Sequence, residues 1–191
     1  MCIYLGLMKR NLLIAFLLSC FTAIAQEDPS YEELLKPVNE VRLTDSLLID
    51  ATPEQLNLLD SITVKKWFAP LLGLAKNNRL KNRNYYLAGK ITSNENFDLL
   101  VLLEEKKKTD SNSVQVVHLV STKKDGRYIA SIEAAATGLK KRSTYNISSW
   151  LYKDYKLVLD SRISVNERSF DDMTSYRINQ GGRFILSERW E

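Results

Sequence analysis

The residue best suited to acid–base chemistry is His118, the one histidine of the chain. It lies in the stretch VQVVHLVSTKKDGRYIASIEAA (114–135), where an Asp-Gly pair separates two runs that alternate as strands do. Asp-Gly tolerates the positive φ angles of a two-residue type I′ turn and therefore predicts a hairpin. Counting back from that turn sets His118 opposite Glu133. A carboxylate beside an imidazole fixes its tautomer and stabilises its charged form, so this pair is a candidate general base.

The same register divides the hairpin into two faces. It sets Lys124 opposite Arg127 next to the turn, and residues then alternate between a core face and a mixed face. The core face carries Val117, Leu119, Ala130, Ile132 and Ala134, and the mixed face carries Val116, His118, Val120, Ile129, Ser131 and Glu133. We favour a plain interpretation, in which His118 and Glu133 are a cross-strand polar pair worth a few tenths to about 1 kcal/mol.

Catalysis by His118 would need a nucleophile or a second metal ligand. No serine lies in a G-x-S-x-G elbow, and the sequence has no second histidine. We therefore predict no metal site and no cofactor, and keep a hydrolase based on the His118 pair and other carboxylates as an alternative. Two carboxylates across a cleft can act together, but neighbours such as Glu104 and Glu105 point to opposite faces of a strand. Asp171 and Asp172 are predicted in a loop.

Two clusters of cations flank the predicted hairpin. One opens the loop before the His118 strand, and the other lies in the loop after its partner strand. In an up-and-down antiparallel sheet both loops emerge at the same end, so six cations are expected on one rim, here called the basic rim: Lys106, Lys107, Lys108, Lys140, Lys141 and Arg142. Such a rim would attract an anionic glycan, a lipid head group or an acidic envelope protein. The alternative is that exposed loops carry lysine for solubility and to discourage edge pairing.

Residues 1–25 have the composition of an export signal. Lys9 and Arg10 precede the apolar run NLLIAFLL, and Ala23-Ile24-Ala25 ends the segment. A charged start, an apolar run of about 7–15 residues and an A-x-A site are typical of a secretory signal peptide. The run is shorter than the roughly 20 residues of a membrane-spanning helix. We therefore expect cleavage between Ala25 and Gln26 and an exported, periplasmic or secreted, product.

A competing signal occupies the same segment. Leu17-Leu18-Ser19-Cys20 resembles the bacterial lipobox, whose cysteine becomes lipidated, so a lipoprotein anchored through Cys20 is the alternative. Cys2 and Cys20 are the two cysteines, and a chain that begins at Gln26 has none and forms no disulfide. Losing the two cations of the signal leaves 25 of the 27 cations against 23 acids, so the formal charge falls from +4 to +2. So small a charge does not favour a nucleic-acid partner.

Between residues 26 and 80 the sequence predicts a layer of short helices. SYEELLK (30–36) has helical spacing. TPEQ (52–55) has the features of a helix start, with threonine as the cap and proline at the first position, so LNLLD (56–60) is expected to continue that helix.

The segment SITVKKWFAPLLGLAK is expected to extend the helical layer. Pro70 lacks a backbone donor, so we expect a break between Phe68 and Leu71. Large aromatic side chains supply much of the packing area where they are buried, and Trp67 and Phe68 are therefore expected to anchor this layer on the core.

From residue 84 onward the apolar period becomes strand-like. Eight short runs, rich in β-branched and aromatic residues and separated by turn-forming residues, predict antiparallel strands: NYYLAGKIT, FDLLVLLEE, VQVVHLVST, RYIASIEAA, TYNISSW, YKLVLDSRISV, SYRIN and RFILSE. Gly181-Gly182 predicts the turn between the last two. We expect an α+β fold in one domain (26–191), with short N-terminal helices (26–80) packed on a curved antiparallel sheet (84–190) of about seven or eight strands, a meander resembling a half-barrel.

These features are typical in style of small secreted or envelope proteins of bacteria, and no motif assigns a family. We expect an exported, non-enzymatic binding or interaction module of the bacterial cell envelope. It would bind its partner through the basic rim or through a pocket between the helices and the sheet. The alternatives are a secreted hydrolase using His118 and Glu133 and a lipid-anchored component of an envelope assembly.

Overall fold

The structure, a computed structural model, describes residues 29–51, 56–92, 95–106, 112–140, 143–166 and 168–190, and at positions 75, 92, 112, 113 and 140 the backbone alone. Some predicted features lie outside these residues. They are the export signal with its cleavage site at Ala25 and Gln26, the lipobox at Cys20, the helix start at 52–55, and four residues of the basic rim, Lys107, Lys108, Lys141 and Arg142.

The first described helix, α2 (Tyr31–Leu35), forms where SYEELLK predicts one. It begins at a capping box: the Ser30 hydroxyl accepts from the Glu33 amide, and the Glu33 carboxylate accepts from the Ser30 amide. This reciprocal bonding satisfies two amides that the first helical turn leaves free.

A run of short helices follows: α3 (Ser61–Trp67), α4 (Ala69–Leu72), the 3₁₀ turn η1 (Gly73–Ala75) and α5 (Lys76–Asn82). Asp60 caps α3, because its carboxylate accepts from the Thr63 amide at 2.7 Å. The break predicted near Pro70 is confirmed, since the helical run is interrupted at Phe68.

Eleven strands, counted over the described residues, form one mixed sheet. They are β1 (Glu40–Arg42), β2 (Ser46–Ile49), β3 (Asn57–Leu59), β4 (Arg83–Thr92), β5 (Asp98–Lys106), β6 (Asn112–Thr122), β7 (Tyr128–Lys140), β8 (Ser143–Tyr152), β9 (Lys156–Val165), β10 (Arg168–Ile178) and β11 (Phe184–Trp190). All eight predicted strands form and make up β4 to β11. The main path runs β1-β4-β5-β6-β7-β8-β9-β10-β11, with β2 beside β8 and β3 beside β4.

The prediction of a purely helical layer over 26–80 is wrong. LNLLD supplies strand β3 and not a helix, and β1 and β2 are additional strands in this region. β1 and β3 both pair with β4, and the β1 pairing is parallel, so the sheet is mixed and not purely antiparallel. The physical reason is that a strand edge presents unpaired N–H and C=O groups, which short extended segments satisfy. A strand of three or four residues is too short for its period to show in the sequence.

Asp171 and Asp172 also differ from their prediction. Both lie inside β10, opposite Arg162 and Ser161 of β9 respectively, and not in a loop. The predicted turn at Gly181-Gly182 is present, and Gly182 has a φ of 78°, a conformation that favours glycine.

The register of the His118 hairpin agrees with its prediction along the middle of the strands. His118 lies opposite Glu133, and Leu119 lies opposite Ile132. Lys124 does not face Arg127, because the last pair before the turn is Thr122 with Tyr128. The pairing agrees with the prediction from His118 to Ser121, and the register shifts by one residue on each side of this segment. A longer turn replaces the two-residue loop, and a bulge beside it restores the predicted register in the middle of the strands. A second bulge, between Val117 and His118, shifts the register by one more residue in the same direction.

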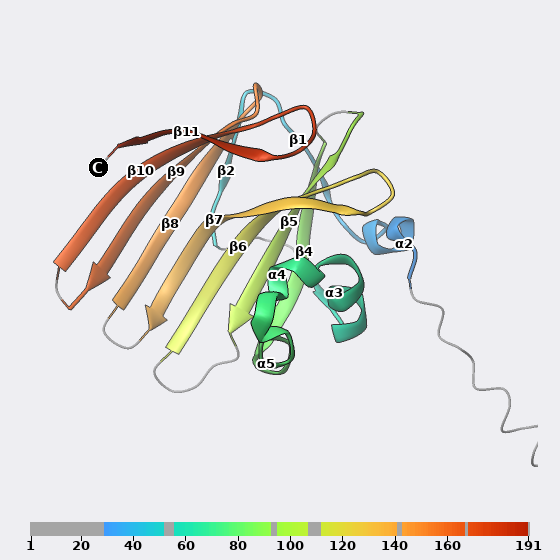
Figure 1. Cartoon of the computed structure of the whole chain (residues 1–191), viewed down its shortest axis with the longest axis horizontal. Helices are drawn as coiled ribbons and strands as arrows, with labels where there is room; N and C mark the ends of the chain where they lie inside the picture. Colours follow the sequence, from blue (N-terminus) through green and yellow to red (C-terminus); the bar gives the residue numbers. More distant parts are fainter. Residues whose placement is uncertain are drawn as a thin grey trace, which may run out of the picture.

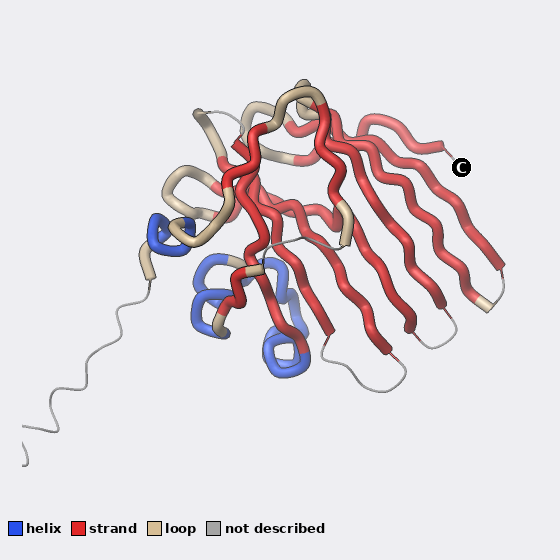
Figure 2. Tube along the Cα trace, turned by 180° about the vertical axis from the view of Figure 1, so that it is seen from behind, coloured by secondary structure: helices blue, strands red, loops and turns tan. Residues whose placement is uncertain are grey.

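The sheet divides between β7 and β8. The first half of β8 pairs with β7 through Ser143 to Ile147, whereas its second half, from Ser149 to Tyr152, pairs with β2. Beyond this point β7 continues with β6 and departs from β8. We call β4 to β7 the covered half and β2 with β8 to β11 the open half. In Figure 1, the covered half carries the helices, and Figure 2 shows the segment with β1 and β2 crossing the opposite side of the molecule.

The side chains show how the two halves overlap. Ile147 shares a face with His118, because ladder partners lie on one face and the rungs run from Ile147 through Ala136 and Val116. Leu151 has the same orientation on β8, yet it packs with Val117, which points to the opposite face of β6. The face of the covered half that carries Val117 therefore lies against the face of the open half that carries Leu151, as in a small sandwich.

Two hydrophobic clusters result from this arrangement. The first lies between the halves and includes Leu99, Leu103, Val117, Leu119, Leu151, Leu157 and Ile178. The second lies between the helices and the covered half and includes Tyr31, Val64, Phe68, Leu72, Leu87, Leu100, Leu102 and Val120. Phe68 is fully buried, and Trp67 packs against this second cluster, so their predicted role as anchors is confirmed. The strands β4 to β6 thus have both faces covered.

Candidate functional site

His118 lies on β6 in the face that the helical layer covers. Its side chain is 6% exposed, and its Nε2 atom is 3.4 Å from Oε2 of Glu104, without the geometry of a hydrogen bond. The pKa of His118 is lowered to about 4, chiefly by burial; Glu133 opposes this change, and Arg79 and Arg83 contribute to it. The imidazole is therefore neutral at pH 7. Glu133, its ladder partner, is exposed.

Glu104 is the acidic centre of this region. Its side chain is 2% exposed and forms ion pairs with Arg83 and, at 3.9 Å, with Arg79. Tyr85 lies opposite Glu104 in the β4–β5 ladder. Glu104 Oε2, His118 Nε2 and the Tyr85 hydroxyl are all buried without a hydrogen-bond partner within the described part of the chain. We call these five residues the buried polar cluster.

The sequence analysis missed this cluster, although a signal for it was present. Leu100, Leu102 and Glu104 alternate along β5, so the acid continues an apolar face. Arg79 and Arg83 are four residues apart and come from the end of α5 and the start of β4. An acid on a buried face needs a cation of this kind, because an unpaired buried charge is costly.

The buried polar cluster has limited capacity for catalysis. Its imidazole and carboxylate lie beneath the helices, and two guanidinium groups compensate the Glu104 charge. The hydroxyl of Ser131, which lies on the same face, is hydrogen-bonded to the Tyr128 hydroxyl at 2.6 Å. The arrangement is that of an ion-pair network which holds α5 against the sheet.

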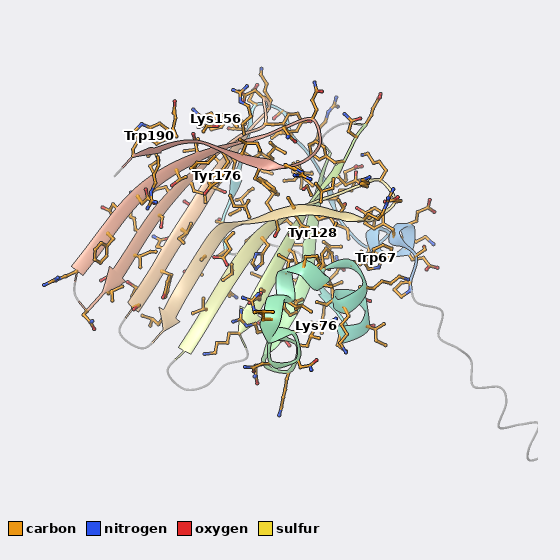
Figure 3. All side chains as sticks on the ribbon, in the orientation of Figure 1. Trp67, Lys76, Tyr128, Lys156, Tyr176 and Trp190 are labelled. Carbon is orange, nitrogen blue, oxygen red and sulfur yellow. The ribbon has the colours of Figure 1, made fainter. Side chains whose placement is uncertain are left out.

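A second buried acid, Asp98, ties helix α2 to the sheet. Its carboxylate accepts from Lys124 at 2.6 Å and from the Tyr31 hydroxyl at 3.3 Å, and the same hydroxyl is 2.6 Å from that of Thr122. Burial raises the pKa of Tyr31, so its phenol keeps its proton. The ring of Trp67, which Figure 3 labels beside α2, is tilted against that of Tyr31, with 5.5 Å between the ring centroids. These contacts are structural and fix the hairpin turn to the helices.

Of the basic rim, the structure describes Lys106 and the backbone of Lys140. Lys106 ends β5 and Lys140 ends β7, with β6 between them. Both strand ends lie at the same end of the sheet, as the meander predicts. Lys106 is also opposite Arg83, which directly follows α5, so this helix ends there as well. The rim as a binding surface stays a prediction.

A pocket lies on the open half of the sheet, on the face turned away from the core. It is lined by Asn146 and Ser148 of β8 and by Asp160 and Arg162 of β9. The ladder sets Asn146 opposite Arg162 and Ser148 opposite Asp160, so all four side chains share one face. We call this surface the outer face and the hollow in it the outer-face pocket.

Large exposed side chains surround the outer-face pocket. Trp150, two residues after Ser148 on the same face of β8, is 43% exposed. On the other side, Asp160 is opposite Met173 of β10, and Met173 is opposite Trp190 of β11. Met173 and Trp190 are each 45% exposed. Figure 3 shows Trp190 at the C-terminal end of β11. Side chains of four neighbouring strands, β8 to β11, thus contribute to one surface.

The outer-face pocket was not predicted from the sequence. The signal that could have found the pocket is the pair of alternating runs, Asn146-x-Ser148-x-Trp150 and Asp160-x-Arg162, on consecutive strands. Which residues face one another depends on the register between those strands, and the turn at 153–155 carries no Asn-Gly or Asp-Gly signal that fixes it.

Comparison with protein families, with curated proteins and with solved structures found no match for this chain. Among the residues that the structure describes, no helix has the length and apolar character needed to cross a membrane.

Proposed function

We propose that the protein is an exported, non-enzymatic binding module of the bacterial cell envelope and that it binds its partner on the outer face of β8 to β11. The observation that carries this proposal is the outer-face pocket, in which four polar side chains converge next to the exposed Trp150. Binding sites commonly combine a few convergent polar groups with an aromatic surface.

The supporting framework is rigid. β9 is paired along its whole length with β8 on one side and β10 on the other, so the side chains of the pocket have fixed positions. Sites built on paired strands hold their geometry better than sites built on loops. A rigid surface loses less conformational entropy when a partner binds.

The buried polar cluster supports a binding module over the hydrolase alternative. His118 is buried and neutral at pH 7, and its nearest carboxylate is paired with Arg83. A general base must reach the proton that it removes. Replacement of His118 by alanine should therefore leave partner binding intact, whereas a hydrolase would lose its activity.

Export and soluble release are the other half of the proposal. They are supported by the charged start, the short apolar run and the Ala23-Ile24-Ala25 site. We expect an exported product whose intact mass begins at Gln26 without acyl chains. A mass that begins at Cys20 with acyl chains would show the lipid-anchored alternative.

The decisive test is retention of a partner from envelope extract. The full chain, exported by its own signal and purified, is immobilised in four forms: native, the outer-face variant Trp150→Ala with Arg162→Ala, the rim variant with all six rim cations changed to Glu, and Phe170→Ala. Phe170 is 57% exposed and lies on the opposite face of the same half of the sheet, so it is a matched control.

The native form, the rim variant and Phe170→Ala should retain the same partner, and the outer-face variant should lose it. Loss in the rim variant alone would move the binding surface to the basic rim. If the native form retained nothing, the proposed function would be wrong.

A further inference from the structure

We infer that the outer-face pocket is a subsite for a neutral saccharide and that the outer face binds an oligosaccharide chain laid across β8 to β11. This inference rests on the proposed function and names the ligand class of the same surface. It follows from the charge of the pocket, from its size, and from the position of the exposed aromatic side chains.

The charged groups of the pocket compensate each other. The Arg162 guanidinium lies 3.5 Å from the Asp160 carboxylate, so an anionic ligand would meet the carboxylate and a cationic one the guanidinium. Asn146 and Ser148 each both donate and accept hydrogen bonds. A hydroxyl also donates and accepts, so it suits all four side chains. The pocket is therefore best matched by a ligand that is rich in hydroxyl groups and has no net charge.

The indole of Trp150 gives this ligand an apolar contact. It lies on the same face as Ser148, two residues along the strand or about 7 Å away, and is 43% exposed. A sugar ring has hydroxyls at its rim and carbon-bound hydrogens on its faces. Its rim can bond to the pocket while one face packs on the indole, which buries apolar surface on both partners.

The size and layout of the surface favour several sugar units. The pocket has a volume of about 220 Å³, below the roughly 300 Å³ at which small-molecule pockets commonly begin, so it suits one ring. Met173 and Trp190 continue the same rung on β10 and β11. From β8 to β11 is three strand spacings, about 14 Å. A chain of a few rings can therefore span from Trp150 to Trp190.

Other partners fit the outer face less well. The outer face carries the acids Asp160, Asp171 and Glu188 beside the cations Lys156, Arg162 and Arg177, so it has no net positive charge that would attract a phosphate. The centre of a protein interface is usually apolar and depleted of charge, whereas here the centre is the polar pocket.

The test uses chemical treatment of the ligand pool, so that the sugar need not be known in advance. The immobilised full chain receives envelope extract in three portions: untreated, digested with proteinase K, and oxidised with metaperiodate, which cleaves vicinal diols. Total sugar and total protein are measured in each eluate. Sugar should be retained from the untreated and digested portions and lost after periodate. Trp150→Ala and the double variant Asn146→Ala with Asp160→Asn should lose it, and Phe170→Ala should keep it.

Direct titration then measures affinity. Neutral hexasaccharides of β-linked glucose, N-acetylglucosamine, mannose and xylose are titrated by calorimetry, with an oligogalacturonate as the acidic comparison. At least one neutral hexasaccharide should bind, more tightly than its monosaccharide, and Trp150→Ala should raise its Kd at least tenfold.

The outcomes separate this inference from the proposed function. A partner that survives periodate, is destroyed by proteinase K and still needs Trp150 would overturn the saccharide inference and leave the binding module standing. Preference for the oligogalacturonate, with loss in the rim variant, would also overturn it. No retention from any portion by the native chain would overturn both.

Discussion

The covered half and the open half of the sheet have the same strand geometry but different surroundings. β4 to β6 are enclosed by the helices on one side and by the open half on the other, so Leu100, Leu102 and His118 are buried although they alternate with core residues. β8 to β10 bury one face and expose the other, on which Trp150 and the outer-face pocket lie. β6, which carries His118, is therefore covered on both faces, whereas the exposed polar side chains of the outer-face pocket lie on β8 and β9, which have no histidine.

The largest expected contrast is in packing. Leu102→Ala should lower the free energy of unfolding by about 2–5 kcal/mol, because Leu102 is fully buried under the helices. Chemical denaturation monitored by circular dichroism measures the change. Leu186→Ala, on exposed β11, is the matched substitution in the open half and should cost far less. Equal losses at the two positions would mean that the helices do not cover β5.

The next contrast concerns buried charge. Glu104→Gln should cost about 1–3 kcal/mol, because the amide cannot replace the charge that compensates Arg83. Glu105→Gln is the control, since Glu105 points to the opposite face and accepts from Tyr86 at one oxygen and from Gln115 at the other. In the variant the amide oxygen can accept from Gln115 while the amide nitrogen donates to the Tyr86 hydroxyl. The same denaturation experiment applies. A cost at Glu105 as large as that at Glu104 would argue against the buried polar cluster.

The third contrast is in pH dependence. The pKa of His118 is lowered from 6.5 to about 4 in the folded chain, so between these values the unfolded chain binds the proton and the folded chain does not. The free energy of unfolding should therefore fall as the pH drops from 6.5 toward 4, with a His118 contribution of at most about 1.4 kcal/mol per pH unit.

The test of this dependence is the difference between native protein and His118→Gln, measured by denaturation at several pH values. Subtraction is needed because Glu104 and Glu133 lie near the imidazole. The stability lost by the native protein on acidification should be partly absent in the variant. Parallel profiles would mean that His118 is not buried as described.

The smallest stability effect is expected where the binding effect is largest. Trp150→Ala should change the free energy of unfolding by about 0.5 kcal/mol or less, as is usual for exposed positions, since the indole is 43% exposed. It should nevertheless abolish retention of the envelope partner. If Trp150→Ala unfolded the protein, the indole would be part of the core and the contrast between the two halves would fail.

The sequence alone predicted the strands of this protein well. β4 to β11 are each at least seven residues long, which is enough for a strand-like pattern to be recognised, although of β10 only the end, SYRIN, was predicted. The pairing of His118 with Glu133 agrees with its prediction because a bulge beside the longer turn restores the register that a two-residue loop would give. The break near Pro70 followed from a property of one residue, the missing amide hydrogen.

The sequence analysis failed where the structure depends on distant partners. LNLLD has apolar spacing that suits a helix, but β4 has an edge to which it can pair as β3. Asp171 and Asp172 suggested a loop, yet β9 supplies ladder partners for both. In each case the hydrogen bonds come from a strand far away in the sequence or from a register that the local residues do not specify.

What the sequence determined by itself is therefore local: the alternation of the strands, the capped start of α2, the turns at Gly126 and Gly182, and the polar and aromatic residue types along β8 and β9. Only the tertiary structure decided that the sheet divides between β7 and β8 and that one half lies against the other. That overlap depends on packing between segments distant in the chain, and it decides which alternating face meets water. It buried His118 and left the outer-face pocket exposed.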